Sequence, residues 1–155
     1  MSEDLFQPSL KHGEYEETKS YNISRIFYIA FFGGVIPTVA LGTKNAKWLK
    51  VDNKIIALMM ALGGLILFSK IIVAGLYTAK VLAVSSSVIK WSYRGATLLL
   101  YMGYYFLMRQ KFQQHVVLGG KIEPILKDTV IWIIVAIAVE AVLLVLGGYV
   151  IRNVL

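Results

Sequence analysis

The chain has 155 residues, a formal net charge of +7 and no cysteine, and 57% of its residues are hydrophobic. A composition this apolar is typical of membrane proteins, and the length leaves little room for a separate soluble domain. The lack of cysteine excludes disulfides, thiolate metal ligands and cysteine nucleophiles. The basic residues flank apolar runs, which favours anchoring at a membrane over binding of nucleic acid.

Four apolar runs predict an all-α membrane protein, a bundle of four transmembrane helices. About 20 helical residues, each rising about 1.5 Å, match a hydrocarbon core about 30 Å thick. The runs lie at about residues 26–42, 55–77, 91–108 and 129–151. We therefore expect two parts, a polar acidic N-terminal tail over residues 1–25 and a transmembrane domain over residues 26–155.

The N-terminal tail is long and net negative, unlike the short basic start of a secretory signal. We expect it to be flexible, with Tyr15 and Tyr21 lying on the membrane surface.

The first run, residues 26–42, is at the short end of what crosses a bilayer. Pro37 lacks an N–H and clashes with the carbonyl of Gly33, so we expect one helix with a kink near Gly33 and Gly34. A hydroxyl such as that of Thr38 can satisfy the freed carbonyl. Kinked helices sometimes line transport sites. We favour a structural role, because proline is frequent in ordinary spans.

Residues 43–54 form the most basic short segment, with Trp48 among four lysines, and we expect a cytoplasmic loop. Asn45 and Lys47 are its candidate functional residues, although a topology anchor is a simpler interpretation than a lipid-headgroup site. The segment 109–128 is also basic. If both lie in the cytoplasm and all four runs span, the N- and C-termini face outward.

The second run, residues 55–77, carries Lys70 within its apolar stretch. Ala57, Ala61 and Gly64 have a spacing of small residues that lets another helix approach closely. Residues 78–90 are ambiguous between a continued helix and a short interfacial turn, and the serines at 85–87 are the best break.

The third run, residues 91–108, has Arg94 near its outer end, where the side chain can snorkel. A polar helical extension follows and is expected to stop at Gly119 and Gly120, since glycine commonly ends helices. His115 in this segment is expected to be solvated, and we find no partners for it in a metal site.

The last run, Thr129–Ile151, holds a single ionisable residue, Glu140, at its centre. A charge at the bilayer centre costs about 2.5 to 3.5 kcal/mol, so it usually faces the bundle and finds a partner. We predict that Glu140 points inward and pairs with Lys70 or Arg94. The pair either fixes helix register or serves as a proton or cation acceptor in a pathway. A single carboxylate makes a poor relay, which favours the structural role.

Two short segments resemble a set of small uncharacterised bacterial membrane proteins. The segments are FFGGVIPTVALGTKNAKWLK at residues 31–50 and QKFQQHVVLGGK at residues 110–121. The resemblance implies a multi-span bacterial inner-membrane protein and no particular reaction. It singles out six positions as places to probe: Gly33, Pro37, Asn45, His115, Gly119 and Gly120.

The sequence contains no Walker A loop, H-E-x-x-H or G-x-S-x-G motif. We therefore expect a non-enzymatic, multi-pass protein of the bacterial cytoplasmic membrane, with no cofactor, metal or nucleic acid. Its first interpretation is an accessory or interaction subunit that packs against another membrane protein or itself. The alternatives are a small homo-oligomeric transporter or channel using Glu140, and a membrane enzyme on lipid-linked substrates, for which only residues 109–121 offer a polar cluster.

Overall fold

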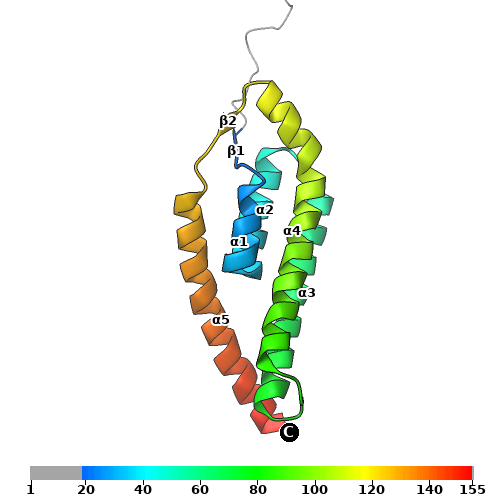
Figure 1. Cartoon of the computed structure of the whole chain (residues 1–155), viewed down its shortest axis with the longest axis vertical. Helices are drawn as coiled ribbons and strands as arrows, with labels where there is room; N and C mark the ends of the chain where they lie inside the picture. The colour runs from blue at the N-terminus through cyan, green and yellow to red at the C-terminus, as the bar shows by residue number, and fades with distance from the viewer. Residues whose placement is uncertain (1–18, 155) are drawn as a thin grey trace, which may run out of the picture.

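The computed structural model describes the backbone of residues 19–154 and the side chains of residues 19–150. The expectations for residues 1–18, including Tyr15, lie outside this range. Five helices and one short pairing of two strands make up the described chain (Figure 1). In order they are β1 (Lys19–Ser20), α1 (Arg25–Gly33), α2 (Val35–Trp48), α3 (Asn53–Thr78), α4 (Ser86–Val117), β2 (Lys121–Ile122) and α5 (Leu126–Val154). The prediction of a helical protein is confirmed.

The first apolar run folds back on itself. Gly34 has φ of 81° and ψ of −163°, a conformation open to glycine, and it separates α1 from α2. The side chain of Asn45, late in α2, contacts the backbone of Tyr21, which precedes α1. The start of α1 and the end of α2 are therefore adjacent, and the two helices form a hairpin. The prediction of one kinked helix over residues 26–42 is wrong, because the chain reverses at Gly34.

The hairpin tip explains the glycine pair and the proline. The break falls where it was predicted, at Gly33 and Gly34, but Pro37 does not kink a helix. It lies in the first turn of α2, where an N–H has no intrahelical partner and proline is tolerated. The hydroxyl of Thr38 donates to the carbonyl of Gly34 at 2.7 Å and so satisfies one tip carbonyl.

Two helices are long and apolar enough to cross a membrane, α3 over Asn53–Thr78 and α5 over Leu126–Val150. They contain the predicted runs 55–77 and 129–151. The third predicted run lies inside α4, which is longer than expected because the polar extension continues the same helix. The serine break is confirmed, since Ser85 caps α4 by accepting a hydrogen bond from the N–H of Ser87 at 3.3 Å.

Helix α4 ends at the predicted glycine pair. Gly119 has a positive φ of 75°. Its N–H donates to the carbonyl of Val116 at 3.1 Å, and the N–H of Gly120 donates to the carbonyl of His115 at 2.8 Å. These two bonds form a Schellman motif, in which a left-handed residue closes the last helical turn.

The hairpin divides the bundle into two halves. It packs among α3, α4 and α5 beside the β1–β2 pairing, and it ends about midway along the molecule (Figure 1). We call this the packed half. Beyond the tip at Gly34, α3, α4 and α5 continue alone to the connection at residues 79–85, and we call this the hollow half.

The strand pairing corrects the predicted placement of the N-terminal segment. Lys19 pairs with Lys121 and Ser20 with Ile122, in parallel. Residues 19–24 therefore lie at the same end as both basic segments, and the prediction that they face the opposite side is wrong. They also belong to the folded bundle, because Tyr21 and Ile23 are buried.

Candidate functional site

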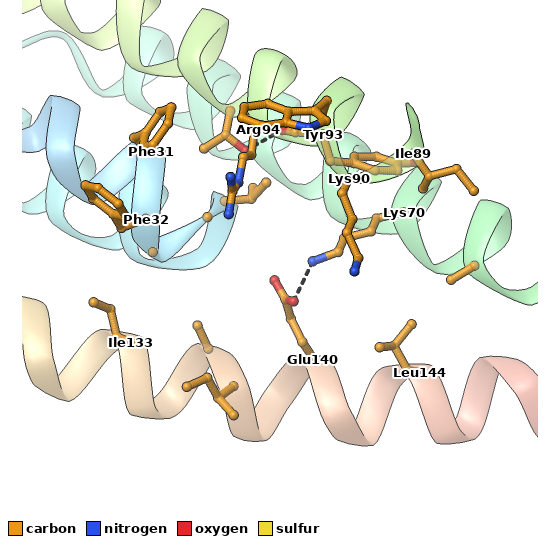
Figure 2. A pocket seen from close by; sticks show the side chains of 18 of the residues that line it. Phe31, Phe32, Lys70, Ile89, Lys90, Tyr93, Arg94, Ile133, Glu140 and Leu144 are labelled. Carbon is orange, nitrogen blue, oxygen red and sulfur yellow. Dashed lines mark hydrogen bonds and ion pairs between the residues drawn. The ribbon is translucent and has the colours of Figure 1, made fainter. Parts of the chain in front are cut away.

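A cavity of about 520 Å³ lies in the hollow half, directly beyond the hairpin tip (Figure 2). The tip of α1 closes one end, while α3, α4 and α5 form the walls. Apolar and aromatic side chains make up most of the lining, and four charged groups are set among them: Lys70, Lys90, Arg94 and Glu140.

Glu140 and Lys70 form an ion pair across this cavity. The Lys70 Nζ lies 2.5 Å from Glu140 Oε2, and the two side chains are 31% and 25% exposed. The pair joins α3 to α5, and the predicted pairing of Glu140 with Lys70 or Arg94 is confirmed for Lys70. It relieves the cost of placing each charge alone in an apolar environment.

Arg94 is the cation that Glu140 does not bind. Its guanidinium lies over two rings, 5.5 Å from the centroid of Phe31 on α1 and 5.1 Å from that of Trp91 on α4. Figure 2 shows Arg94 and Lys70 projecting from α4 and α3 toward α5. Within residues 19–150, neither Arg94 nor Lys90 has a carboxylate partner.

The cavity is therefore electropositive, with three cations against one carboxylate. The hairpin tip adds no net positive field, since the C-terminus of α1 and the N-terminus of α2 both line the cavity and carry partial charges of opposite sign. The carboxylate of Glu140 lies beside this tip: Oε1 lies 3.8 Å from the point that a Cβ on Gly34 would occupy.

A second polar cluster, which we call the Tyr21 cluster, closes the packed half. The N–H of Tyr21 donates to Oδ1 of Asn45 at 2.7 Å, and Nδ2 of Asn45 donates to the carbonyl of Tyr21 at 3.4 Å. The Tyr21 hydroxyl donates to Asp128, and Lys44 Nζ lies 2.5 Å from the same carboxylate. The cluster thereby joins the segment before α1, the end of α2 and the start of α5.

The environment of this cluster raises the pKa values of Tyr21 and Lys44. Burial, followed by the hydrogen bond to Asp128, raises the pKa of the Tyr21 hydroxyl. The hydrogen bond to Asp128 is the main cause that raises the pKa of the Lys44 ammonium. Tyr21 is 1% exposed, so its predicted position on the membrane surface is wrong.

The residues predicted as functional loop candidates lie in or at the ends of helices, and none of them lines the cavity. Asn45 is fully buried in α2 rather than in a loop, and Lys47 is exposed on the last turn of the same helix. His115 was expected to be solvated, but it is 6% exposed and its ring packs against Gly120. Helix α4 continues past it, so the segment around His115 and Gly119 is a helix end.

Sequence reasoning missed the roles of Tyr21, Lys44, Asp128 and Lys90. The signal available for the Tyr21 cluster was one acidic and one basic residue at the ends of two apolar runs. Their proximity depends on the hairpin, which brings residue 44 back to the level of residue 21. Lys90 belonged to the segment left ambiguous, and its place in the cavity follows from the start of α4 at Ser86.

Comparison with known proteins gives no match, whether to a family, to a curated protein or to a solved structure. The resemblance to small bacterial membrane proteins stays a prediction. Within the described residues, no group of three histidine or acidic side chains is placed to hold a metal ion. The cavity beyond the hairpin tip is the candidate site.

Proposed function

We propose that this chain is a multi-pass membrane protein that crosses the bilayer three times, through α3, α4 and α5. The hairpin enters from one face and returns to it. Helix α1 has 9 residues, a length of about 13 Å, whereas a crossing needs about 30 Å. Large apolar side chains are exposed on the long helices, with Phe68 62% exposed, Leu99 68% and Val145 72%, and a bilayer would cover them.

The distribution of cations supports an orientation with the packed half toward the cytoplasm. Cytoplasmic segments carry an excess of lysine and arginine. In the described side chains the packed end holds Lys19, Arg25, Lys44, Lys47, Lys50, Lys54, Arg109, Lys111, Lys121 and Lys127, against Lys80 and Lys90 at the hollow end. Three crossings place residue 19 inside and the end of α5 outside. A bacterial cytoplasmic membrane is the membrane that the sequence favours.

We further propose that the protein is a non-enzymatic accessory subunit whose cavity binds a ligand from the outer leaflet. The observation that carries this proposal is that the bundle is hollow on one side of Gly34 and filled on the other. In the packed half, a Cβ on Gly42 would lie 3.0 Å from the ring of Tyr104, and Thr38 and Leu41 are fully buried. The cavity therefore ends blindly at the hairpin.

A small transporter or channel is the second candidate. The observation that favours it is the broken backbone at Gly34 beside Glu140, because discontinuous helices supply ion and substrate sites in transporters. A conduit requires the hairpin to move out of the packed half during each cycle.

Contact with a partner helix fits either candidate. Ala57, Ala61 and Gly64 lie exposed on α3, whereas the neighbouring Gly63 is buried and packs against Val39. The predicted small-residue face is thus left outside the bundle. We propose that it receives a helix of a second copy or of another membrane protein.

The sidedness of thiol labelling tests the blind cavity. The chain has no cysteine, so single cysteines are introduced without a background. Ala74 lines the cavity, Ala30 is fully buried in the packed half, and Val145 is exposed on the apolar exterior. In proteoliposomes of known orientation, Ala74→Cys is expected to react with charged methanethiosulfonates added at the hollow end only. Ala30→Cys and Val145→Cys are the matched controls and are expected to stay unlabelled.

Two results contradict the proposal. Labelling of Ala74→Cys from both sides would show a conduit and support the transporter. Absence of labelling from either side, in protein with an unchanged melting temperature, would show that no hydrated cavity exists.

A further inference from the structure

We propose that the cavity binds the phosphate headgroup of an anionic lipid, with Arg94 and Lys90 holding the phosphate. This inference rests on the proposed function and names the ligand class of the same site. The lipid enters sideways from the leaflet at the hollow end, and its acyl chains lie against the apolar face of α5.

The charge balance of the cavity calls for an anion. Lys70 and Glu140 neutralise each other at 2.5 Å, which leaves the charges of Arg94 and Lys90 without a carboxylate partner in the described side chains. An arginine at this depth is costly without a counter-charge. The position of Arg94 over the rings of Phe31 and Trp91 offsets part of that cost. Guanidinium groups bind phosphate oxygens with two parallel hydrogen bonds.

The positions of the two cations along α4 suit a ligand that comes from the membrane surface. Arg94 lies eight residues after Ser86, the start of α4, and so about 12 Å along the helix. Lys90 lies one helical turn nearer the surface. The two cations thus lie at successive depths between the outer interface and the cavity, and their long side chains are able to reach a phosphate at either depth.

The walls suit a lipid better than a free anion. Helices α4 and α5 each pack along α3 but have no extended contact with each other (Figure 1). Ile133, Ile137 and Leu144 of α5 line the cavity. A volume of about 520 Å³ lies within the range of ordinary ligand sites, roughly 300 to 1,000 Å³. A headgroup fits there while the chains stay among apolar side chains.

Quenching of tryptophan fluorescence by brominated lipids tests the inference at the site itself. The chain has three tryptophans, and replacing Trp48 and Trp132 by phenylalanine leaves Trp91 in the cavity wall as the only reporter. Vesicles of phosphatidylcholine receive equal mole fractions of brominated phosphatidylglycerol or brominated phosphatidylcholine. Brominated phosphatidylglycerol is expected to quench Trp91 at a mole fraction about tenfold lower than brominated phosphatidylcholine, which is the effect of one charge-assisted contact.

The variants separate a site from a general preference for anionic lipid. Arg94→Gln and Lys90→Gln are expected to abolish the preference, and Arg94→Lys to keep part of it. Arg109→Gln is the matched control on the same helix, outside the cavity lining, and is expected to behave as the parent does. Melting temperatures of all variants show that each is folded.

Three outcomes would overturn the inference. The first is equal quenching by the two lipids in the parent protein. The second is an unchanged preference in folded Arg94→Gln. The third is loss of the preference on adding inorganic phosphate, which would assign the site to a free anion. Labelling of Ala74→Cys from the hollow end stands apart from these results, so failure here leaves the blind cavity in place.

Discussion

The packed and hollow halves contain charges of both signs, yet they use them in opposite ways. In the packed half, the polar groups of Tyr21, Asn45 and Asp128 face one another and are satisfied within the fold. In the hollow half, one ion pair joins α3 to α5, and Arg94 is left over aromatic rings at the edge of a cavity. Satisfied polar groups hold a structure together, whereas unpaired charge in an apolar setting indicates a ligand. Under the proposed function, this difference separates the scaffold from the candidate site.

The largest expected effect is loss of the Asn45 side chain. Asn45→Leu keeps the volume but leaves the N–H and carbonyl of Tyr21 without partners in a buried position. Unfolding in detergent is expected to become easier by about 3 kcal/mol. Asn53→Ala, at an exposed position, is the control and is expected to change stability by less than about 0.5 kcal/mol. Equal melting temperatures for the two variants would show that Asn45 does not hold the hairpin.

A pair of glycine substitutions compares the halves directly. A Cβ on Gly42 would lie 3.0 Å from the Tyr104 ring, whereas a Cβ on Gly95 would meet no atom within 4 Å. Gly42→Ala is expected to destabilise by about 2 kcal/mol through overpacking. Gly95→Ala is expected to stabilise by up to about 1 kcal/mol through helix propensity. Thermal unfolding of both variants measures the difference, and a destabilising Gly95→Ala would mean that another chain covers this part of α4.

The ion pair of the hollow half is expected to contribute less. Glu140→Gln and Lys70→Met each leave one charge without its partner, at a cost of about 1 kcal/mol, since water reaches a quarter to a third of each side chain. The double variant is expected to regain part of that loss. A double-mutant cycle with additive effects would show that the two charges are not coupled.

The Tyr21 cluster in the packed half makes stability depend on pH in alkaline solution. The Tyr21 cluster raises the pKa of the Tyr21 hydroxyl above 10.0 and that of the Lys44 ammonium above 10.5. A raised pKa means that the fold favours the protonated form, so this stability is present below the unfolded values and lost as the pH rises through the folded ones. Tyr21→Phe is expected to flatten the alkaline loss measured by thermal unfolding. The exposed Tyr28→Phe is not expected to change it.

The apolar runs and the pairing of Glu140 with Lys70 were predictable because they depend on local pattern. A helix such as α3 follows from a continuous apolar stretch, and the pairing of Glu140 with Lys70 follows from the cost of a lone charge between helices. The hairpin was not predictable from the sequence pattern. Hydropathy indicates that residues 26–42 are surrounded by apolar groups, but it does not show that the chain reverses at Gly34. The one sign in the sequence against residues 26–42 crossing the bilayer as a single helix was the short length of this run.

Three of the charged residues of the candidate site were predictable, but Lys90 and the shape of the site were not. The sequence placed Lys70, Arg94 and Glu140 at bilayer depth. Which cation binds Glu140, and which stays free, depends on how the α1 tip brings Phe31 beneath Arg94. The burial of Asn45 and His115 likewise follows from tertiary contacts, since both residues lie in basic segments that resemble loops.

The most direct test of the hairpin is the sidedness of three single cysteines in sealed membrane vesicles. Ser24, Asn53 and Lys80 are exposed and lie before α1, at the start of α3 and after α3. A membrane-impermeant maleimide is expected to reach Ser24→Cys and Asn53→Cys from the cytoplasmic side, and Lys80→Cys from the outer side only. Labelling of Ser24→Cys from the same side as Lys80→Cys would mean that the first apolar run crosses the membrane, and it would contradict the division of the bundle into a packed and a hollow half.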